Sequence, residues 1–269
     1  MYLSTIKEAA IEAGKILMDY LGNVREIEVK NDQQFNLVTE ADKAAEKAIV
    51  ELIRQRFPDH SILAEEGGAI DADSDCRWII DPLDGTTNFA HVFPIFSVSI
   101  ALEKAGKVVA GVVYNPALHE FFHTEKGKGA YLNDKRIHVS STTNMERGLL
   151  VTGFPYNVRE NPDLCVERLN AFLYAAHGIR RLGSAAIDCA YVACGRFDGY
   201  WEIWLQPWDV AAGALMIREA GGVTTNFHGD THSIYNRQFL GSNGHIHEQM
   251  IAVLKEVEQR DASENTPSK

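Results

Sequence analysis

The sequence predicts a mixed protein of helices and strands, in which an α+β half, residues 1–146, is followed by an α/β half, residues 147–269. Three observations lead to this prediction. Two amphipathic helical patterns open the chain, short apolar runs typical of a mostly antiparallel sheet follow them, and strand and helix patterns then alternate to the end. At 269 residues the chain is nearly twice as long as a typical domain of roughly 150 residues, which agrees with either one large domain or two closely packed halves.

The first half is expected to begin with two helices. Apolar residues recur at helical spacing over residues 3–21, before Gly22, and a second helical segment spans residues 39–57, before Pro58. Short apolar runs typical of strands follow at residues 61–64, 77–81, 96–104, 107–115, 120–125 and 129–133.

The second half alternates between strand and helix patterns. Strands are expected at residues 149–153, 179–183, 198–204 and 238–242, and helices at residues 162–176, 184–194, 209–220 and 245–258. Such alternation is typical of layered α/β structure. The sequence contains no internal repeat and no low-complexity linker, so we expect the two halves to share one large interface.

The composition excludes several classes of protein. With 26 Lys and Arg against 37 Asp and Glu, the formal net charge is −11, which argues against nucleic acid or an anionic membrane as the main partner. An acidic protein that binds phosphate needs metal ions or backbone dipoles as local positive charge. No apolar run approaches the roughly 20 residues that span a bilayer, and the first residues do not resemble a cleaved signal peptide. The four cysteines form no CxxC pair, so a reducing cytoplasm is the expected compartment.

The densest chemical signal is the segment WIIDPLDGTTN at residues 78–88. An apolar strand is expected to end at Asp81, because Pro82 cannot continue a strand ladder, and the chain then turns through Asp84. Two carboxylates three residues apart on a rigid turn are able to converge on one point. Mg²⁺ takes a few carboxylates together with water and substrate phosphate. Asp81, Asp84 and the carbonyl oxygen of Leu83 therefore form a candidate partial metal site.

The same segment offers a place for a phosphate group. Gly85 and Thr86 stand where a short helix is expected to begin, so their backbone N–H groups are open to a phosphate oxygen. Asp, Pro and Gly are also the usual residues of turns, and a simple turn is the alternative interpretation of the segment.

Two more acidic positions gain meaning only if they meet Asp81. Glu65 follows an apolar run and precedes two glycines, and alone it is more typical of an exposed acidic loop. Asp209 lies in the first turn of a helix that starts after Pro207, where a carboxylate also serves as a simple helix cap. If both converge on Asp81, the site lies between the two halves, a common place for small ligands.

Candidate substrate contacts lie where a strand is followed by a helix. Gly183, Ser184 and Ala185 are small residues at an expected helix start, which lets a ligand approach closely. Glu202 lies on the strand before Asp209 and would accept hydrogen bonds from the hydroxyl groups of a sugar or polyol. A surface or ion-paired acid is an equal alternative for Glu202. The sequence lacks a GxSxG nucleophile signature, which disfavours a covalent hydrolase.

Taken together, these motifs resemble those of the inositol monophosphatases, within the wider lithium-sensitive, metal-dependent phosphatase superfamily that includes fructose-1,6-bisphosphatase. Three segments carry the resemblance in the expected order: AEEGG at residues 64–68, WIIDPLDGTTNF at residues 78–89, and PWDVAAGALMIREAGG at residues 207–222. Further matches at residues 37–42, 111–133, 183–186 and 198–202 extend the resemblance over almost the whole chain.

The resemblance implies a five-layered αβαβα fold, usually in a homodimer, and magnesium-dependent hydrolysis of a small phosphate monoester by water, without a phosphoenzyme. Among such substrates it favours myo-inositol monophosphate. It assigns Glu65, Asp81 and the carbonyl group of Leu83 to a first metal ion, and Asp81, Asp84 and Asp209 to a second. A third and weaker Mg²⁺ is expected near Glu65.

The resemblance also implies roles in the reaction. Thr86 and Glu65 would orient the attacking water, with Asp42 hydrogen-bonded to Thr86, while the backbone amides of Gly85 and Thr86 hold the phosphate. Arg181 follows Arg180 in a pair that is similar to the sequence of bacterial members of the family. It would help to bind a second anionic group of the substrate.

The sequence departs from the family pattern at Trp204 and Gln206, where a small residue and a basic residue or His are more usual. Both residues lie close to Glu202, in the wall that would recognise the substrate. The sequence therefore leaves alternatives to inositol monophosphate open. These are fructose-1,6-bisphosphate, histidinol phosphate or an adenosine bisphosphate as the substrate, or a binding or regulatory role beside catalysis. Inhibition by lithium is an expectation from the family.

Overall fold

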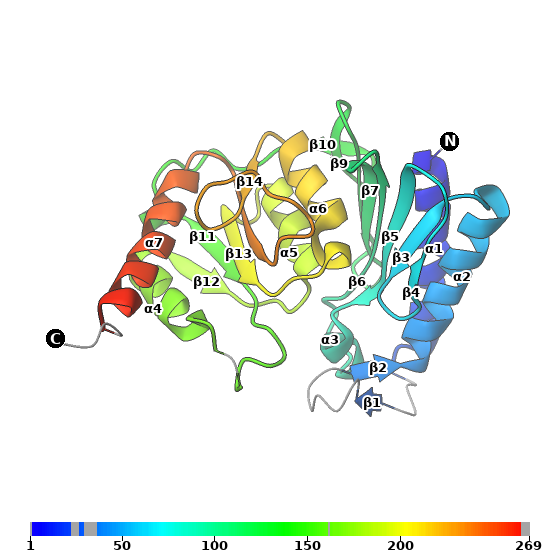
Figure 1. Cartoon of the computed structure of the whole chain (residues 1–269), viewed down its shortest axis with the longest axis horizontal. Helices are drawn as coiled ribbons and strands as arrows, with labels where there is room; N and C mark the ends of the chain where they lie inside the picture. The colour runs from blue at the N-terminus through cyan, green and yellow to red at the C-terminus, as the bar shows by residue number, and fades with distance from the viewer. Residues whose placement is uncertain (1, 23–26, 30–36, 161, 265–269) are drawn as a thin grey trace.

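The computed structural model of the chain describes residues 2–22, 27–29, 37–160 and 162–264. Figure 1 shows five layers side by side, with helices on the two outer faces, a sheet inside each, and a pair of helices in the middle. The helices of these layers are α1 (Tyr2–Tyr20) and α2 (Glu40–Arg56) outside the first sheet, α5 (Ala185–Ala193) and α6 (Pro207–Glu219) between the sheets, and α4 (Cys165–Ala175) and α7 (His247–Glu264) outside the second. The predicted αβαβα fold is confirmed.

The first sheet has eight strands and is mostly antiparallel, as the sequence predicts. In spatial order its strands are β10 (Lys135–Ile137), β9 (Gly129–Leu132), β8 (Glu120–Glu125), β7 (Lys107–Asn115), β6 (Ser97–Lys104), β5 (Cys76–Asp84), β3 (Ser61–Ala64) and β4 (Gly68–Ile70). Strands β3 and β5 run parallel to each other. The sequence pattern predicts neither β4 nor β10, because three residues are too few to show a period of two.

The second sheet has five strands. In spatial order they are β12 (Gly178–Arg180), β11 (Leu149–Thr152), β13 (Gly199–Ile203), β15 (Gln238–Ser242) and β14 (Val223–Thr225). Strands β12, β11 and β13 are parallel, whereas β15 runs antiparallel to both of its neighbours. The parallel strands follow from the strand and helix alternation of the sequence, since a parallel pair needs a crossover connection. A separate two-stranded hairpin, β1 (Ile27–Val29) and β2 (Leu37–Thr39), was not predicted either.

Helix α1 buries the apolar stripe that its sequence predicts. The residues buried along it are Thr5, Ile6, Ala9, Ala10, Ala13, Gly14 and Leu17. The helix is followed by Gly22, whose φ of 78° lies in the left-handed region that favours glycine. A Cβ atom on Gly14 would lie 2.4 Å from the ring of Tyr114, so this glycine lets α1 approach β7 closely. Within the part of the chain that the structure describes, every helix is too short or too polar to cross a bilayer.

The two central helices pack closely against each other and against the first sheet. A Cβ atom on Gly213 of α6 would lie 2.3 Å from the Cβ atom of Cys189 on α5. On the other side of α6, a Cβ atom on Gly111 of β7 would lie 2.9 Å from the Cα atom of Ala212. Because protein interiors are close-packed, these contacts hold α6 in one place relative to the sheet. Asp209, in the first turn of α6, is held with it.

Candidate active site

Strand β5 carries both aspartates of the DPLD segment. The prediction that the strand ends at Asp81 is wrong, because β5 continues to Asp84 and its pairing with β6 shifts register between these two residues. The irregularity accommodates Pro82, since a bulged residue need not donate a hydrogen bond to the ladder. The backbone N–H of Leu83 donates to Oδ1 of Asp81 over 3.0 Å. The bulge therefore fixes a buried carboxylate, only 2% exposed, where the sheet faces the central helices.

Asp84 lies against the start of α5. The hydroxyl group of Ser184 donates to Oδ2 of Asp84 over 2.5 Å, and the backbone N–H groups of Ala185 and Ala186 donate to the same carboxylate at 3.2 and 2.8 Å. A carboxylate is favoured here because the N-terminus of a helix carries partial positive charge. The predicted substrate contacts Ser184 and Ala185 thus hold a predicted metal ligand in this structure.

The two halves of the chain also meet at a pair of glycines. Gly85 has a φ of 98°, and a Cβ atom on it would lie 3.0 Å from the carbonyl oxygen of Ile95 and 3.2 Å from that of Gly183. Only glycine fits both the backbone conformation and the space. Gly85 precedes the short helix α3 (Thr86–Ala90), which confirms that a helix begins at this point.

The hydroxyl group of Thr86 donates to the carbonyl oxygen of Leu83 over 3.1 Å. A hydroxyl group has one hydrogen, so in this structure Thr86 does not donate to Asp42, the partner that the resemblance implies. Asp42 itself is fully buried on α2, and its negative charge contributes to raising the pKa of Asp81.

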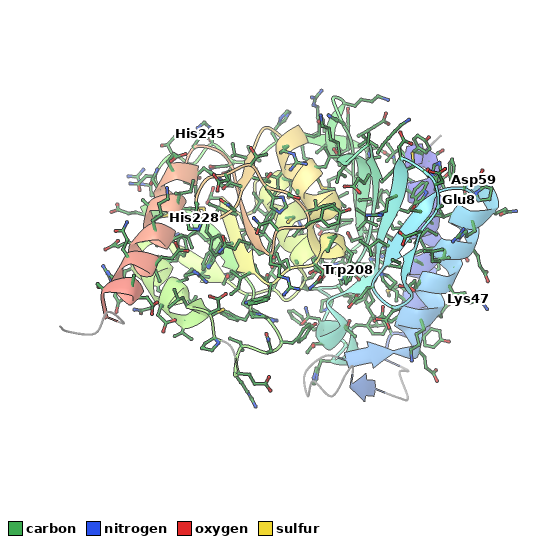
Figure 2. The ribbon with its side chains drawn as sticks, in the orientation of Figure 1. Glu8, Lys47, Asp59, Trp208, His228 and His245 are labelled. Atoms are coloured by element: carbon green, nitrogen blue, oxygen red, sulfur yellow. The ribbon has the colours of Figure 1, made fainter. Side chains whose placement is uncertain are left out.

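Glu65 and Asp209 approach the aspartates of β5 from opposite halves. The backbone N–H of Glu65 donates to the carbonyl oxygen of Ile80 over 3.1 Å, which places Glu65 beside the residue that precedes Asp81. Oδ2 of Asp209 accepts the backbone N–H of Gln206 over 2.6 Å, so Asp209 also serves as the helix cap that its position suggests. Figure 2 shows Trp208 where α6 begins beside the first sheet.

Electrostatics show that these carboxylates belong to one cluster. Burial raises the pKa of Asp81 well above its ordinary range, and the charges of Glu65, Asp84 and Asp209 raise it further. Burial also raises the pKa of Asp209, with further contributions from Asp84, Glu65 and Glu202. For Asp84, burial outweighs the three hydrogen bonds from α5 and raises its pKa to about 6. The cluster thus concentrates negative charge, and a bound cation would stabilise the ionised carboxylates.

A cavity of about 510 Å³ is lined in part by Glu65 and Asp209 of this cluster. Its lining comes from both halves and comprises Glu65, Phe154, Pro155, Tyr156, Asn157, Glu202, Ile203, Trp204, Leu205, Gln206, Trp208, Asp209 and Arg237. The volume suits a small ligand. Burial and the nearby charges of Glu65, Asp84 and Asp209 raise the pKa of Tyr156, so its phenol group also lies within the field of the cluster.

Glu202 and Trp204 form one wall of the cavity. Oε2 of Glu202 accepts the hydroxyl hydrogen of Tyr200 over 2.6 Å, and a Cβ atom on Gly153 would lie 2.0 Å from the same oxygen, so glycine makes room for the carboxylate. Trp204 has a φ of 64°, an uncommon conformation for a bulky residue. Its indole N–H donates to Asp163 over 3.1 Å, and the guanidinium group of Arg237 lies 4.9 Å from its ring centre.

The sequence model of the Inositol monophosphatase family matches residues 2–259, nearly the whole chain. The chain belongs to the inositol monophosphatase family. A relative from Synechocystis sp. named inositol-1-monophosphatase is 43% identical over 96% of this chain and 90% of its own length. A relative from Pasteurella multocida named Nus factor SuhB is 40% identical over 93% of this chain and 91% of its own length.

A solved structure supports the same membership. An inositol monophosphatase from Anabaena (Nostoc) sp. superposes with a TM-score of 0.87, at 43% sequence identity, and covers 95% of both chains. The layered architecture therefore agrees with that of an inositol monophosphatase over 95% of the chain.

The residues of this inositol monophosphatase-family site fit a hard divalent cation by the chemistry of their donors. The buried carboxylates and the carbonyl group of Leu83 supply oxygen ligands only, which Mg²⁺ prefers. Among the described residues, no group of three or more Asp, Glu, His or Cys side chains is arranged to hold a metal ion. The carboxylates of Asp81, Asp84 and Asp209 face backbone N–H groups instead. Because Mg²⁺ keeps several waters and also binds substrate phosphate, a complete protein cage is not required.

Several residues of the site carry no motif signal. Arg237 and Tyr156 line the cavity from loops of the second half, and nothing in their sequence surroundings marks them as site residues. Arg181, which the resemblance singles out, is exposed, yet its charge lowers the pKa of Glu202. Only the tertiary fold brings Arg237 and Tyr156 to the same cavity.

Proposed function

We propose that this member of the inositol monophosphatase family is a magnesium-dependent phosphatase that releases phosphate from a small phosphate monoester, with myo-inositol monophosphate as the first candidate. The observation that carries the proposal is the cluster of Glu65, Asp81, Asp84 and Asp209. Within it the charges of Glu65 and Asp84 raise the pKa of Asp81 and that of Asp209, and Glu65 and Asp209 line a cavity of suitable size. An anionic substrate would be repelled from such a cluster unless cations were bound there.

The proposed ligands follow the acidic motifs. Glu65, Asp81 and the carbonyl oxygen of Leu83 would hold one ion, Asp81, Asp84 and Asp209 a second, and a third would lie near Glu65. A carboxylate oxygen has two lone pairs, so Asp84 is able to keep a hydrogen bond from α5 and still bind a cation. When bound, the ions neutralise the charge of the phosphate and make a water molecule a better nucleophile.

The protein would hold the reacting groups in place. The backbone N–H groups of Gly85 and Thr86 would donate to phosphate oxygens. Because the hydroxyl hydrogen of Thr86 is engaged by the carbonyl group of Leu83, Oγ1 of Thr86 is left as an acceptor for a hydrogen of the attacking water. The carboxylate of Glu65 would accept the other hydrogen of the water, and Asp42 would help to position Thr86. Two acceptors on one water fix the direction of its lone pair toward phosphorus.

The leaving group would lie in the cavity beyond the phosphate. Glu202 would accept hydrogen bonds from hydroxyl groups of the polyol, with Gly183, Ser184 and Ala185 allowing its close approach. Arg181 would supply positive charge for a second anionic group.

A substrate with a second anionic group is the alternative that one observation favours. Arg237 stacks on Trp204 at the cavity and adds a cation to a lining whose other charged residues, Glu65, Glu202 and Asp209, are acidic. Fructose-1,6-bisphosphate and the adenosine bisphosphates carry such a group, and histidinol phosphate carries a cationic one instead. The name Nus factor SuhB, carried by the relative from Pasteurella multocida among others, supports a regulatory binding role beside catalysis as a further proposal.

A phosphate-release screen tests the proposed function. Purified protein would be assayed with myo-inositol 1-phosphate, fructose 1,6-bisphosphate, histidinol phosphate and adenosine 3′,5′-bisphosphate. Each substrate would be tested once with about 5–10 mM Mg²⁺ and once with EDTA in place of Mg²⁺. We expect magnesium-dependent release, fastest with the inositol phosphate. Release that is equally fast in EDTA would contradict the metal proposal, and no release from any monoester would contradict the enzymatic one.

Four further expectations are proposals for this chain: homodimeric assembly and inhibition by lithium, which the family resemblance implies, and residence in the cytoplasm and a division of the site between residues 1–146 and 147–269, which the sequence patterns predict. Light scattering on the purified chain tests the first, and a lithium titration of phosphate release tests the third.

A further inference from the structure

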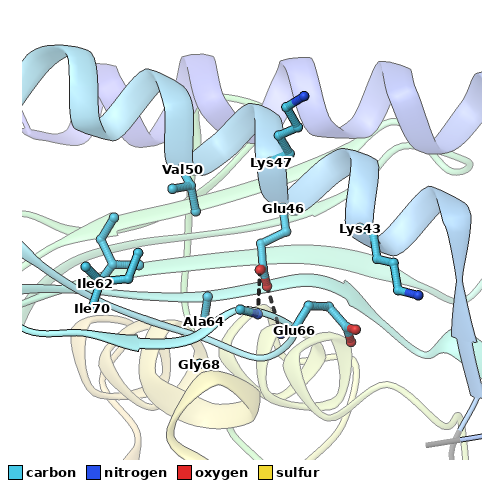
Figure 3. Close-up of a pocket in the computed structure, with 10 residues that line it drawn as sticks. Lys43, Glu46, Lys47, Val50, Ile62, Ala64, Glu66, Gly68 and Ile70 are labelled. Carbon is cyan, nitrogen blue, oxygen red and sulfur yellow. Dashed lines mark hydrogen bonds between the residues drawn. The ribbon is translucent and has the colours of Figure 1, made fainter.

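Glu46 lies outside the acidic motifs but touches the loop that carries Glu65. It is on α2, is 7% exposed, and its carboxylate accepts the backbone N–H of Glu66 over 2.8 Å and that of Gly67 over 2.7 Å. Figure 3 shows the side chain reaching from the helix to the loop, with both hydrogen bonds drawn. One buried carboxylate thus takes two successive amides of the loop.

The loop is short, and each of its amides is held. Ala64 of β3 pairs with Gly68 of β4, so Glu65, Glu66 and Gly67 form the whole connection between the two strands. The amide of Glu65 donates to the carbonyl group of Ile80 on β5, and the other two amides donate to Glu46. The backbone on both sides of Glu65 is therefore fixed relative to β5 and α2.

Only a carboxylate satisfies both amides. Its two oxygens are acceptors and it has no donor, whereas the amide group of a glutamine would turn an N–H₂ group toward one of the two N–H groups. Burial raises the pKa of Glu46, and the charges of Glu66 and Glu65 raise it further, which makes a carboxylate costly at this place. The two backbone hydrogen bonds oppose that shift.

Gly67 is matched to this carboxylate. A Cβ atom on Gly67 would lie 2.8 Å from Oε1 of Glu46, and among the described atoms the remaining one within 4 Å also belongs to Glu46. Any side chain at position 67 would therefore push against Glu46, and through it against the hydrogen bonds that hold the loop.

We propose that Glu46 is a positioning residue that holds Glu65 in its place as a metal ligand by fixing the loop of residues 65–67. The inference rests on the proposed function, since it assigns to Glu46 a role toward the cation that Glu65 would bind. Residues that orient metal ligands typically change metal affinity by about 10- to 100-fold when they are replaced. A residue that only stabilised the loop would change the melting temperature and leave metal affinity unaltered.

The first test measures binding of Mn²⁺ alone, by calorimetry, to the full chain without substrate. We expect Glu46→Gln to weaken the Mn²⁺ affinity by about tenfold or more. Glu51→Gln, the same change at an exposed position of α2, should leave it within about twofold of the wild-type value. Affinities of Glu46→Gln and Glu51→Gln that agree within twofold would overturn the inference. A wild-type chain that binds no Mn²⁺ would instead overturn the proposed function.

A second test does not depend on the stability of one variant. Gly67→Ala should weaken Mn²⁺ binding in the wild-type background, because its methyl group displaces the Glu46 carboxylate. In a Glu46→Ala background that carboxylate is gone, and adding Gly67→Ala should change the affinity by less than twofold. Residues that act through one contact give such non-additive effects. Equal effects of Gly67→Ala in both backgrounds would overturn the inference.

Discussion

Ser184 donates its hydroxyl hydrogen to Oδ2 of Asp84 over 2.5 Å, although the two residues lie 100 positions apart in the chain. The contact joins β5 of the first sheet to the start of α5 and is buried on both sides, at 2% exposure for Ser184 and 9% for Asp84. The same serine oxygen accepts the backbone N–H of Ile187 over 3.4 Å. One hydroxyl group therefore caps a central helix and orients a proposed metal ligand.

Replacing Ser184 by alanine should lower both stability and activity. The lost cap costs about 1 kcal/mol, and Asp84 loses the shortest of its three hydrogen bonds, so we expect kcat to fall by about tenfold. Thermal unfolding and phosphate release measure the two effects.

The chain offers a matched control for this change. Ser140 donates to Oδ1 of Asp198, also over 2.5 Å, in a pair that lies outside the cavity lining. Ser140→Ala should lower the melting temperature to a similar extent and leave kcat within about twofold of wild type. If Ser140→Ala slowed phosphate release as much as Ser184→Ala does, the effect on activity would be a general consequence of lost stability.

Asp84→Asn should nearly abolish turnover while the chain stays folded. The substitution removes a negative charge from the proposed metal cluster and replaces one acceptor by an N–H₂ group that faces the amides of α5. We expect kcat at saturating Mg²⁺ to fall by about 100-fold or more. Asp198→Asn is the control, because Asp198 also accepts a serine hydroxyl and a backbone amide, from Leu149. Turnover by Asp84→Asn within a few fold of wild type would contradict the assignment of Asp84.

The fold could be predicted from the sequence where an element is long enough to show a period. The stripe of α1 and the nine residues of β7 are such elements, and the structure confirms both. The three-residue strands β4, β10 and β14 are too short to show one. The end of β5 was misplaced because the rule that proline breaks a strand applies to a regular ladder, and the ladder is irregular at Pro82.

The site could be predicted only where a motif marked it. Asp81, Asp84 and Asp209 lie in recognisable segments, and the charges of Asp84 and Asp209 raise the pKa of Asp81. The partners of these residues depend on the tertiary fold and have no local signal. Neither the contact of Ser184 with Asp84 nor that of Glu46 with the loop after Glu65 follows from any spacing in the sequence.

Glu202 makes the metal-free protein sensitive to pH. Burial raises its pKa to about 7 from an ordinary value of 4.5, so the folded state binds a proton more tightly than the unfolded state does. Its contribution to stability is complete below pH 4.5 and is lost as the pH rises through about 7. In Glu202→Gln the side chain cannot ionise, and its oxygen can still accept the hydroxyl hydrogen of Tyr200. In EDTA at pH 8 we expect this variant to melt about 2–4 °C above wild type.

The comparison at low pH completes this prediction. At pH 4.5 Glu202 is protonated in the folded state, so Glu202→Gln and wild type should melt at nearly the same temperature. The exposed control Glu51→Gln should follow the wild-type curve throughout. A constant difference between Glu202→Gln and wild type at both pH values would show that the ionisation of Glu202 is not its cause.

Trp204 combines an unfavourable backbone conformation with a place in the substrate wall. A bulky residue at a φ of 64° costs on the order of 1–3 kcal/mol, which its contacts with Asp163, Arg237 and the core beside the second sheet offset. Trp204→Gly relieves the backbone cost and removes the wall. We expect the cavity to admit larger leaving groups, so that kcat/KM for a bulky aryl phosphate rises relative to that for an inositol monophosphate by about tenfold.

Trp204→Ala separates the two effects. Alanine removes the same indole contacts, so Trp204→Ala should share the altered selectivity of Trp204→Gly. It keeps a Cβ atom at a positive φ, so its free energy of unfolding should be about 1 kcal/mol lower than that of Trp204→Gly, and it should melt at a lower temperature. Equal melting temperatures for the two variants would contradict the strain at Trp204. Both variants remove the whole indole ring. If the ratio of kcat/KM for the aryl phosphate to kcat/KM for the inositol monophosphate were unchanged in both, Trp204 would not limit the size of the leaving group.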